Sequence, residues 1–304
     1  MSSTEDFESH FNRLMETRGS DVTLDRFESG AIENDGNKLH LDIIAAKQDA
    51  PTIVFVPGTA AYGLVYGNFL AALGDAGFNV VSFDPRGHGQ SGGKPGSYTI
   101  QEIISDTRAT IDYARKRFGD DIFLSGSSQG GIVAFYTAAT DERLSGVICH
   151  NAADLADPKN LNMTTHPRIT RMFKYVIMGL AKIAPETKIS IARYFALLSK
   201  GENAAKERMA KDPYMQKVIT LKALASLSSA KMARSVEKIT TPVLMLHAGN
   251  DTIFPQSLSE HLHGRLTCDK QLSVYDGLGH FLFSEHVENV IPDIKSWVET
   301  KSVS

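Results

Sequence analysis

A serine stands at the centre of a G-x-S-x-G pattern formed by residues 126–130. Residues 121–125 before it are typical of a short buried strand, and residues 131–139 after it are typical of a buried helix. A serine at the tip of so tight a strand–turn–helix connection has strained backbone angles, and strand and helix pass each other only where the neighbours are small. The helix also directs its first N–H groups at whatever the serine attacks. The pattern therefore predicts that Ser128 is a nucleophile.

A base and an acid for this serine follow two later strands. A serine hydroxyl attacks a carbonyl only when a base lies within hydrogen-bond reach and an acid orients that base. Asp251 follows the apolar run 243–246, and His280 lies in a glycine-rich segment after the run 271–275. Open α/β sheets build their sites beyond the C-terminal ends of strands, where all three residues are expected. The sequence predicts the triad Ser128, Asp251 and His280.

Each member of this triad has a rival. Ser127 is a second hydroxyl in the pattern, but it occupies a variable position. His286 is a spare base on the following predicted helix, and Asp154 is a reserve acid after another predicted strand. We favour Ser128, Asp251 and His280 because each lies in a turn next to a strand end.

Other reactive side chains are interpreted as structural. Asp84 and His88 lie in a tight turn that an aspartate–arginine pair with Arg86 could fix. His261 and His263 are two residues apart on a predicted helix, so they face different sides and do not predict a metal site. Neither a G-x-G-x-x-G nor a P-loop pattern occurs, so we expect no nucleotide, and we predict no metal or other cofactor.

The elements that position these residues are predicted to form a mostly parallel sheet. Continuous apolar runs are typical of strands buried on both faces, and helical stretches separate them, which indicates an α/β fold. Residues 22–27 and 39–44 instead alternate apolar and polar side chains, and a turn at residues 34–37 lies between them, so they predict an antiparallel hairpin. The buried runs are residues 52–56, 79–83, 122–124, 146–149, 243–246 and 271–275.

The strand pattern stops between about residues 153 and 236, where we predict an all-helical insertion. Two sets of apolar residues follow helical spacing there. The first set is Ile169, Met172, Phe173, Val176, Ile177, Leu180 and Ile183, and the second is Met215, Val218, Ile219 and, less regularly, Leu224 and Leu227.

The charge of the insertion differs from that of the rest of the chain. Residues 154–236 contain 15 Lys or Arg against 6 Asp or Glu, which gives a net charge of +9. Because the whole chain has a net charge of −3, the residues outside this segment have a net charge of −12. The basic residues fit a solvated helical surface, attraction of an anionic substrate, or contact with an anionic membrane surface. The sequence leaves these three interpretations open.

Composition excludes several classes of protein. The 304 residues suffice for one large domain with an insertion, and 42% hydrophobic with 22% charged residues is typical of a soluble globular protein. A net charge of −3 argues against a dedicated nucleic-acid binder. The first residues are polar and acidic, unlike a signal peptide, and the apolar runs fall short of the ~20 residues that span a bilayer. Cys149 and Cys268 are interpreted as free thiols, so we expect a cytoplasmic protein.

In combination, the motifs resemble the α/β-hydrolase fold of the serine type, similar to the branch of monoacylglycerol lipases, lysophospholipases and carboxylesterases. The resemblance covers roughly residues 36–152 and 237–300, through the pattern at 126–130, the loop 84–92, the acid loop 249–255 and the Gly-x-Gly-His at 277–280. It implies a hydrolase core at 21–152 and 237–304 and a helical cap at 153–236 over the site. Residues 1–20 are polar and are interpreted as a lead to the core, with a short helix expected around residues 7–15.

The resemblance also implies an oxyanion hole made of two backbone N–H groups, which stabilise the charge that develops on the attacked carbonyl. One belongs to Gln129, the residue after the nucleophile. The other is assigned to Thr59, after the strand at 52–56. Here the family's usual His-Gly is replaced by Pro57-Gly58, so the glycine of the turn is kept and the imidazole is missing.

These features predict a serine hydrolase acting on a carboxylic ester. The partner would be a small-molecule acyl substrate: a small or medium-chain ester, a monoacylglycerol, a lysophospholipid or a lactone. Part of the cap helix is predicted to line the substrate pocket, through Met172, Phe173, Val176 and Ile177. The same triad serves thioesterases and carbon–carbon bond hydrolases, and a ligand sensor on a hydrolase scaffold is a further alternative. The sequence predicts no oligomeric state.

Overall fold

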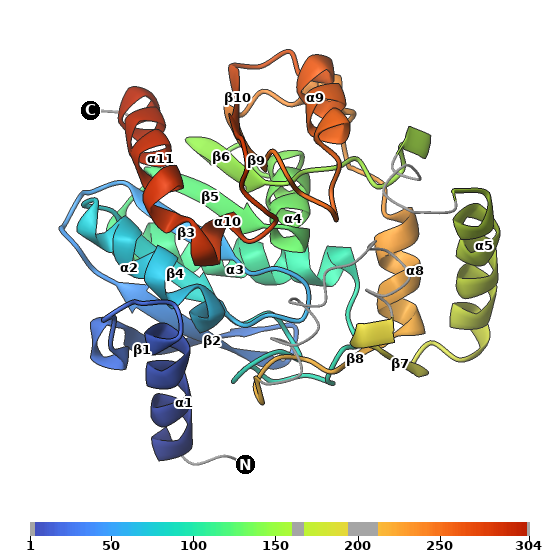
Figure 1. The fold of residues 1–304 in the computed structure, drawn as a ribbon, viewed down its shortest axis with the longest axis horizontal. Helices are drawn as coiled ribbons and strands as arrows, with labels where there is room; N and C mark the ends of the chain where they lie inside the picture. Colours follow the sequence, from blue (N-terminus) through green and yellow to red (C-terminus); the bar gives the residue numbers. More distant parts are fainter. Residues whose placement is uncertain (1–3, 160–166, 194–211, 303–304) are drawn as a thin grey trace.

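A single sheet organises the chain. The computed structural model describes residues 4–159, 167–193 and 212–302, and eight strands within them form a sheet in the order β1-β2-β4-β3-β5-β6-β9-β10 (Figure 1). β2 pairs antiparallel with β1 and β4, and the pairs from β4 to β10 are parallel, which confirms the predicted α/β class. The strands are β1 (Glu28–Asn34), β2 (Asn37–Ile44), β3 (Thr52–Val56), β4 (Asn79–Phe83), β5 (Ile122–Ser127), β6 (Gly146–His150), β9 (Val243–Ala248) and β10 (Lys270–Tyr275).

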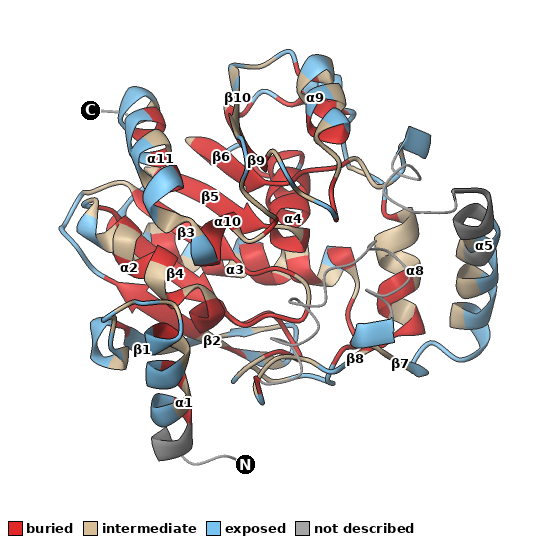
Figure 2. Cartoon of the chain, in the orientation of Figure 1, coloured by how far each residue is buried: buried red, intermediate tan, exposed pale blue. Residues whose placement is uncertain are grey.

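Helices cover both faces of the sheet, which explains why its central strands are apolar throughout. The buried cluster on one face includes side chains of α1, α2, α10 and α11, and the cluster on the other face includes side chains of α3, α4, α8 and α9. All residues of β3, β4, β5, β6 and β9 are buried (Figure 2). The helices are α1 (Thr4–Glu16), α2 (Gly67–Asp75), α3 (Ile100–Phe118), α4 (Gln129–Ala138), α8 (Leu221–Ser229), α9 (Gln256–Arg265), α10 (Leu282–Glu285) and α11 (Val287–Lys301).

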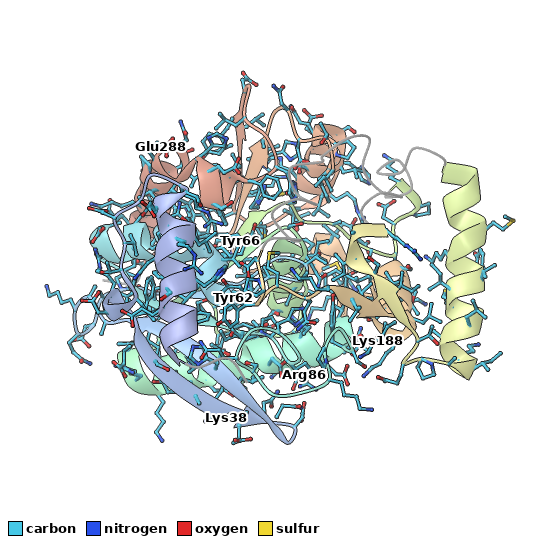
Figure 3. The ribbon with its side chains drawn as sticks, turned by 60° about the horizontal axis from the view of Figure 1, so that its bottom comes forward. Lys38, Tyr62, Tyr66, Arg86, Lys188 and Glu288 are labelled. Atoms are coloured by element: carbon cyan, nitrogen blue, oxygen red, sulfur yellow. The ribbon has the colours of Figure 1, made fainter. Side chains whose placement is uncertain are left out.

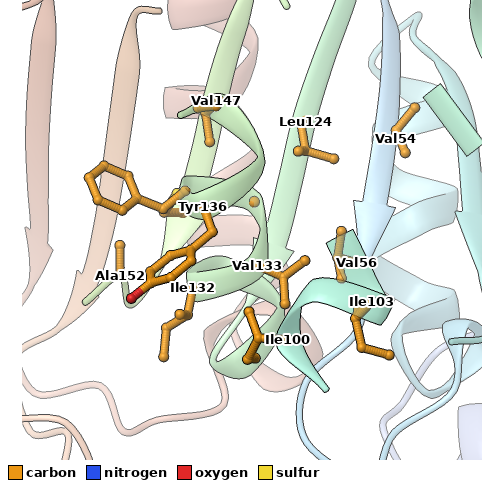
Figure 4. Packing of buried hydrophobic residues seen from close by; sticks show 14 of the residues in the cluster. Val54, Val56, Ile100, Ile103, Leu124, Ile132, Val133, Tyr136, Val147 and Ala152 are labelled. Carbon is orange, nitrogen blue, oxygen red and sulfur yellow. The ribbon is translucent and has the colours of Figure 1, made fainter. Parts of the chain in front are cut away.

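Branched side chains fill the layer between the sheet and α4. Val54 and Leu124 on neighbouring strands share one buried cluster with Val133 and Tyr136 of α4 (Figure 4). Val133 is 1% exposed and Tyr136 is 2% exposed, so α4 has almost no freedom to shift against the sheet. This layer fixes the turn at residues 126–130, because the turn joins β5 directly to α4.

The predicted hairpin is present, but its first strand lies later than expected. Asn34 pairs with Asn37, and Asp35 (φ 47°) with Gly36 (φ 72°) form the left-handed turn between β1 and β2. Residues 22–27 are not a strand, because a short 3₁₀ helix, η1 (Leu24–Arg26), occupies them. β1 is a partly exposed edge strand of sequence ESGAIEN, and such a polar strand gives a weaker alternation than the segment before it.

The first residues are part of the hydrophobic core, whereas the sequence suggested only a polar lead. They contain α1, which is longer than the helix expected around residues 7–15. Phe7, Phe11 and Met15 are 6%, 0% and 1% exposed, and they join the core that contains α2 and α11. Their spacing of four residues places them on one face of the helix.

The insertion is not all-helical within its described residues. Helix α5 (Pro167–Ile183) confirms the first apolar set as a helix. Val218 and Ile219 of the second set belong to β8 (Val218–Thr220), which pairs antiparallel with β7 (Lys188–Ser190). Three-residue strands are too short for a period of two to stand out from helical spacing. Leu224 and Leu227 lie in α8, and two further 3₁₀ turns, η2 (Gly63–Tyr66) and η4 (Val236–Lys238), complete the described elements.

Two further findings bear on the sequence predictions. Cys149 is buried, Cys268 is half-buried, and both are free. Among the described residues, the helices are too short or too polar for any of them to cross a membrane.

Candidate active site

The turn at Ser128 has the strained geometry that the sequence predicted. Ser128 has φ 55° and ψ −116°, a conformation unfavourable for a residue with a side chain. Its backbone N–H donates to the His150 carbonyl at 2.8 Å. A Cβ on Gly126 would lie 2.2 Å from the Gly130 oxygen, and one on Gly130 would lie 2.1 Å from the Val56 oxygen. Both glycines are therefore required by close backbone approach.

His280 and Asp251 meet as an imidazole–carboxylate pair. His280 Nδ1 lies 2.7 Å from Asp251 Oδ2, with the two side chains 8% and 0% exposed. The backbone N–H groups of Ile253 and Phe254 donate to the other carboxylate oxygen, each at 2.8 Å. Burial raises the pKa of Asp251, but the hydrogen bond and charge of His280 and the N–H of Phe254 outweigh burial and lower it to about 2. Asp251 is thus an oriented anion near neutral pH.

Ser128 and His280 line the same cavity, which has a volume of about 690 Å³. This volume lies within the range of small-molecule sites. Apolar side chains from several elements form much of its wall, and charged side chains also reach it. The apolar lining includes Leu14, Val65, Met215, Ile253, Phe281 and Phe283.

The two residues assigned to an oxyanion hole are joined by their side chains. Gln129 is the first residue of α4, so its N–H has no acceptor within the helix. Its side-chain oxygen accepts from Thr59 Oγ1 at 2.9 Å and from the Tyr98 hydroxyl at 3.1 Å. Thr59 and the preceding Gly58 line the cavity. These bonds hold the loop after β3 against the start of α4, so both backbone amides have a fixed position relative to Ser128.

Tyr66 supports the loop where the family's histidine is missing. Its hydroxyl accepts from the Gly58 N–H at 3.3 Å. A Cβ on Gly58 would lie 2.8 Å from this hydroxyl. Sequence reasoning missed Tyr66, since a tyrosine in a short 3₁₀ turn gives no local pattern that points to the loop.

A second histidine, His150, lies beneath the site and was also missed. It ends β6 and is fully buried, and its Nδ1 lies 3.1 Å from Ser127 Oγ. Its ring centre is 5.2 Å from that of His280. Burial lowers the pKa of His150 well below the usual value, with the charge of His280 acting in the same direction. His150 is therefore a neutral ring that contacts both Ser127 and the ring of His280.

The rival residues take other roles in the structure. The Ser127 hydroxyl is bonded to His150 and is 4% exposed, whereas Ser128 is half-buried at the cavity. Asp154 accepts from Arg265 at 3.2 Å. His280, rather than His286, is the histidine bonded to Asp251.

The turn after β4 is not fixed by the pair of Asp84 and Arg86 that the sequence suggested. Asp84 accepts the N–H groups of Gly63 and Gln90 at 2.8 and 2.7 Å instead of pairing with Arg86. Burial, together with the charge of Asp42, raises the pKa of Asp84 to about 6. Arg86 makes a two-pronged ion pair with the fully buried Asp106, with its closest N–O distance at 2.6 Å.

The predicted pocket residues of the insertion do not line the cavity in the described part of the chain. Met172 and Val176 are 61% and 48% exposed, and Ile177 packs on the core beside α8. The side chain of Phe173 lies outside the described residues. The other three are not among the cavity-lining residues because α5 packs along α8, away from the sheet (Figure 1).

Three ligand-type side chains do come together. Ligand atoms of His150, Asp251 and His280 lie within 4.8 Å of one another. Two of the three, His280 and Asp251, are the predicted base and acid, which lie 2.7 Å apart. The third, His150, is a neighbouring histidine. His261, one of the two helical histidines, pairs with Asp157 at 2.9 Å.

Comparison with known proteins settles the family. The family model for "Serine aminopeptidase, S33" matches residues 47–287. The chain belongs to this family of α/β hydrolases. The monoacylglycerol lipase of Mycolicibacterium smegmatis is 26% identical to it over 266 residues, covering 81% of this chain and 87% of that protein.

Solved structures agree with this assignment. The monoacylglycerol lipase of Paleococcus ferrophilus is similar, with a TM-score of 0.69 and 27% identity, over 87% of this chain and 99% of that one. A soluble variant of the Saccharomyces cerevisiae monoglyceride lipase has a TM-score of 0.74 and 19% identity, over 93% of this chain and 98% of that one. The chain is thus a hydrolase of the α/β fold that resembles the monoacylglycerol lipase branch.

Proposed function

We propose that this hydrolase cleaves a carboxylic ester through an acyl-enzyme on Ser128. One arrangement carries the proposal: strained Ser128 shares a cavity with His280, and buried Asp251 holds the Nδ1 side of that imidazole at 2.7 Å. This leaves Nε2 as the basic nitrogen of the ring. A nucleophile, a base and an oriented acid are the parts that acyl transfer requires.

Each residue has a defined role in the proposed reaction. His280 takes the hydroxyl proton as Ser128 attacks the ester carbonyl, and Asp251 stabilises the imidazolium that forms. The amides of Thr59 and Gln129 stabilise the oxyanion. His280 then donates its proton to the leaving alcohol and activates water, which releases the acid and restores Ser128.

The proposed substrate is a small or medium-chain apolar acyl ester, including a monoacylglycerol. Apolar residues form much of the cavity wall, and a monoacylglycerol lipase is among the similar proteins. Thioesters and carbon–carbon bonds are alternative substrates for the same triad, so the assay includes an acyl thioester and a β-diketone beside the esters.

The test compares wild type with Ser128→Ala on p-nitrophenyl esters from acetate to laurate. We expect the variant to lose at least about 10⁴-fold in kcat/KM. The matched control is Ser127→Ala, the neighbouring hydroxyl bonded to His150, for which we expect a much smaller loss. Full activity of Ser128→Ala would refute the assignment. Tight binding of an ester without turnover by wild type would favour a ligand sensor, and faster thioester or diketone turnover would favour those reactions.

A further inference from the structure

Helix α1 carries two neighbouring stripes of side chains with different functions. The first stripe, Phe7, Phe11 and Met15, is buried against the core. The second stripe is His10, Arg13 and Leu14, continued by Thr17 directly after the helix, and all four line the cavity that contains Ser128 and His280. Spacings of three and four residues place each stripe on one face. The helix is thus docked along one stripe and presents the adjacent stripe to the candidate site.

The docked stripe fixes the position of the helix. A Cβ on Gly67 would lie 2.6 Å from the Phe11 ring, so this glycine lets α1 approach α2 closely. The Phe7 ring packs edge-on against the rings of Tyr62 and Tyr214, with ring centres 5.9 and 4.7 Å apart. Figure 3 labels Tyr62. Just after α1, Arg18 donates to the Val65 carbonyl. These contacts hold the helix as a rigid part of the cavity wall.

The wall also includes Asp212 and Met215 of the insertion. His10 Nε2 lies 3.2 Å from both the Tyr62 hydroxyl and Asp212 Oδ2. Asp212 in turn accepts the N–H groups of Tyr214 and Met215. Met215 lines the cavity together with Leu14. Leu14 is therefore held close to the position set by the polar contacts of His10, one helical turn before it.

The family model begins at residue 47, well after α1. The triad and the loop after β3 lie within residues 47–287, which the model matches. The α1 part of the wall is thus contributed by a segment outside the matched region.

We propose that α1 is a specificity-determining wall of the substrate site and that Leu14 contacts the apolar chain of the bound ester. Leu14 is the apolar side chain of the second stripe and is half-buried. An apolar chain gains free energy by covering such a side chain, whereas His10, Arg13 and Thr17 offer polar groups. The wall therefore sets how long a chain the cavity accepts. The proposal rests on the proposed esterase function.

The experiment changes the size of this one side chain. Leu14→Trp fills the cavity next to α1 and Leu14→Ala enlarges it. The matched control is Asn12→Trp, which places the same indole on the exposed side of α1, away from the cavity lining. Two substrate series are measured: p-nitrophenyl esters of increasing acyl length, and butyrate esters of increasing alcohol length. The readout is the ratio of kcat/KM between the longest and shortest ester of each series.

We expect Leu14→Trp to lower this ratio by about tenfold or more in at least one series, chiefly through KM, because a single methylene in an apolar pocket is worth 10-fold or more. Leu14→Ala should move the optimum in the same series toward longer chains, and Asn12→Trp should leave the ratio as in wild type. Unchanged ratios in both series, in folded and active Leu14 variants, would overturn the proposal and leave the esterase function standing. Absence of hydrolysis by the wild-type chain would instead overturn the function itself.

Discussion

Helices α4 and α5 both carry large apolar side chains, but α4 has no charged residue, whereas α5 also contains four Lys or Arg residues. Their surroundings differ as well. Every residue of α4 is buried, and it begins at the strained turn of Ser128. Helix α5 exposes a row of large hydrophobic side chains, and Figure 2 colours part of this helix as exposed. This row consists of Met172, Tyr175, Val176, Leu180 and Ile183. Apolar periodicity thus predicts that a segment is a helix, while its place relative to the sheet decides what the helix does.

The contrast extends to backbone contacts. Gly130 in α4 has no room for a methyl group because the Val56 carbonyl is so close, whereas a Cβ on Gly179 in α5 would meet nothing within 4 Å. Because acyl transfer needs residues in fixed positions, we assign it to the part of the molecule that packs on the sheet, which includes α4 and not α5. The following variants test this division, beginning with the largest expected effect.

The largest effect is expected at the acid that orients the base. Asp251→Asn keeps the shape of the side chain but presents an N–H to His280 Nδ1, which forces the wrong tautomer of the imidazole. We expect kcat on a p-nitrophenyl ester to fall by about 10⁴-fold. The control is Asp154→Asn, which alters a carboxylate bonded to Arg265 and should change kcat by about threefold at most. Equal losses in the two variants would contradict the assignment of Asp251.

The next prediction compares how much a ring in α4 and a ring in α5 each contribute to the free energy of unfolding. Phe135→Ala in α4 removes a ring that is 0% exposed, and we expect the free energy of unfolding to fall by about 3–5 kcal/mol. Tyr175→Ala in α5 removes a ring that is 67% exposed, and we expect a change within about 0.5 kcal/mol. Urea unfolding measures both. A loss of several kcal/mol for Tyr175→Ala would show that α5 is covered by a partner in solution.

Glycine variants sharpen the same comparison. Gly130→Ala places a methyl carbon 2.1 Å from a backbone oxygen, so we expect a loss of about 3 kcal/mol in unfolding free energy together with reduced ester hydrolysis. Gly179→Ala adds a methyl group in open space and should stabilise the protein by about 0.5–1 kcal/mol. Thermal unfolding with parallel activity assays distinguishes them. Matching effects would mean that the two helices are equally constrained.

A smaller effect than the loss at Gly130 is expected from the titration of Asp251. Its native pKa of about 2 lies below the value of about 3.9 for an unfolded aspartate. The depressed pKa contributes about 2 kcal/mol of stability, which is complete above about pH 5 and is lost as the pH falls toward 2. The difference in unfolding free energy between wild type and Asp251→Asn should shrink by this amount over that range. A constant difference would show that the carboxylate is not held as an anion.

Much of the sheet and the His280–Asp251 contact could be predicted from sequence because the signals are local. Buried strands appear as continuous apolar runs, and the residues of the site follow strands in glycine-rich turns. His150 and Tyr66 could not be predicted, since their contacts with Ser127 and Gly58 join separate strands and turns. The four-residue spacing of Phe7, Phe11 and Met15 indicates that α1 packs against another surface. This spacing does not reveal which surface the helix covers.

The outward position of α5 could not be predicted for a similar reason. Its apolar stripe is equally typical of a helix that packs on the main domain. The neighbour that it contacts instead is α8, which directly follows the β7–β8 pair. Three-residue strands give no sequence pattern of their own. The expected pocket residues therefore failed where a tertiary arrangement, rather than a local motif, decided the outcome.

The central claim is that Ser128 forms the covalent intermediate. The most direct measurement is mass spectrometry of the wild-type protein after reaction with a fluorophosphonate, with fragmentation of the peptide that contains Ser127 and Ser128. The account predicts one phosphonyl group on the Ser128 hydroxyl, and none on Ser127, with loss of ester hydrolysis in proportion to labelling. A group on Ser127, or full labelling with undiminished hydrolysis, would contradict it.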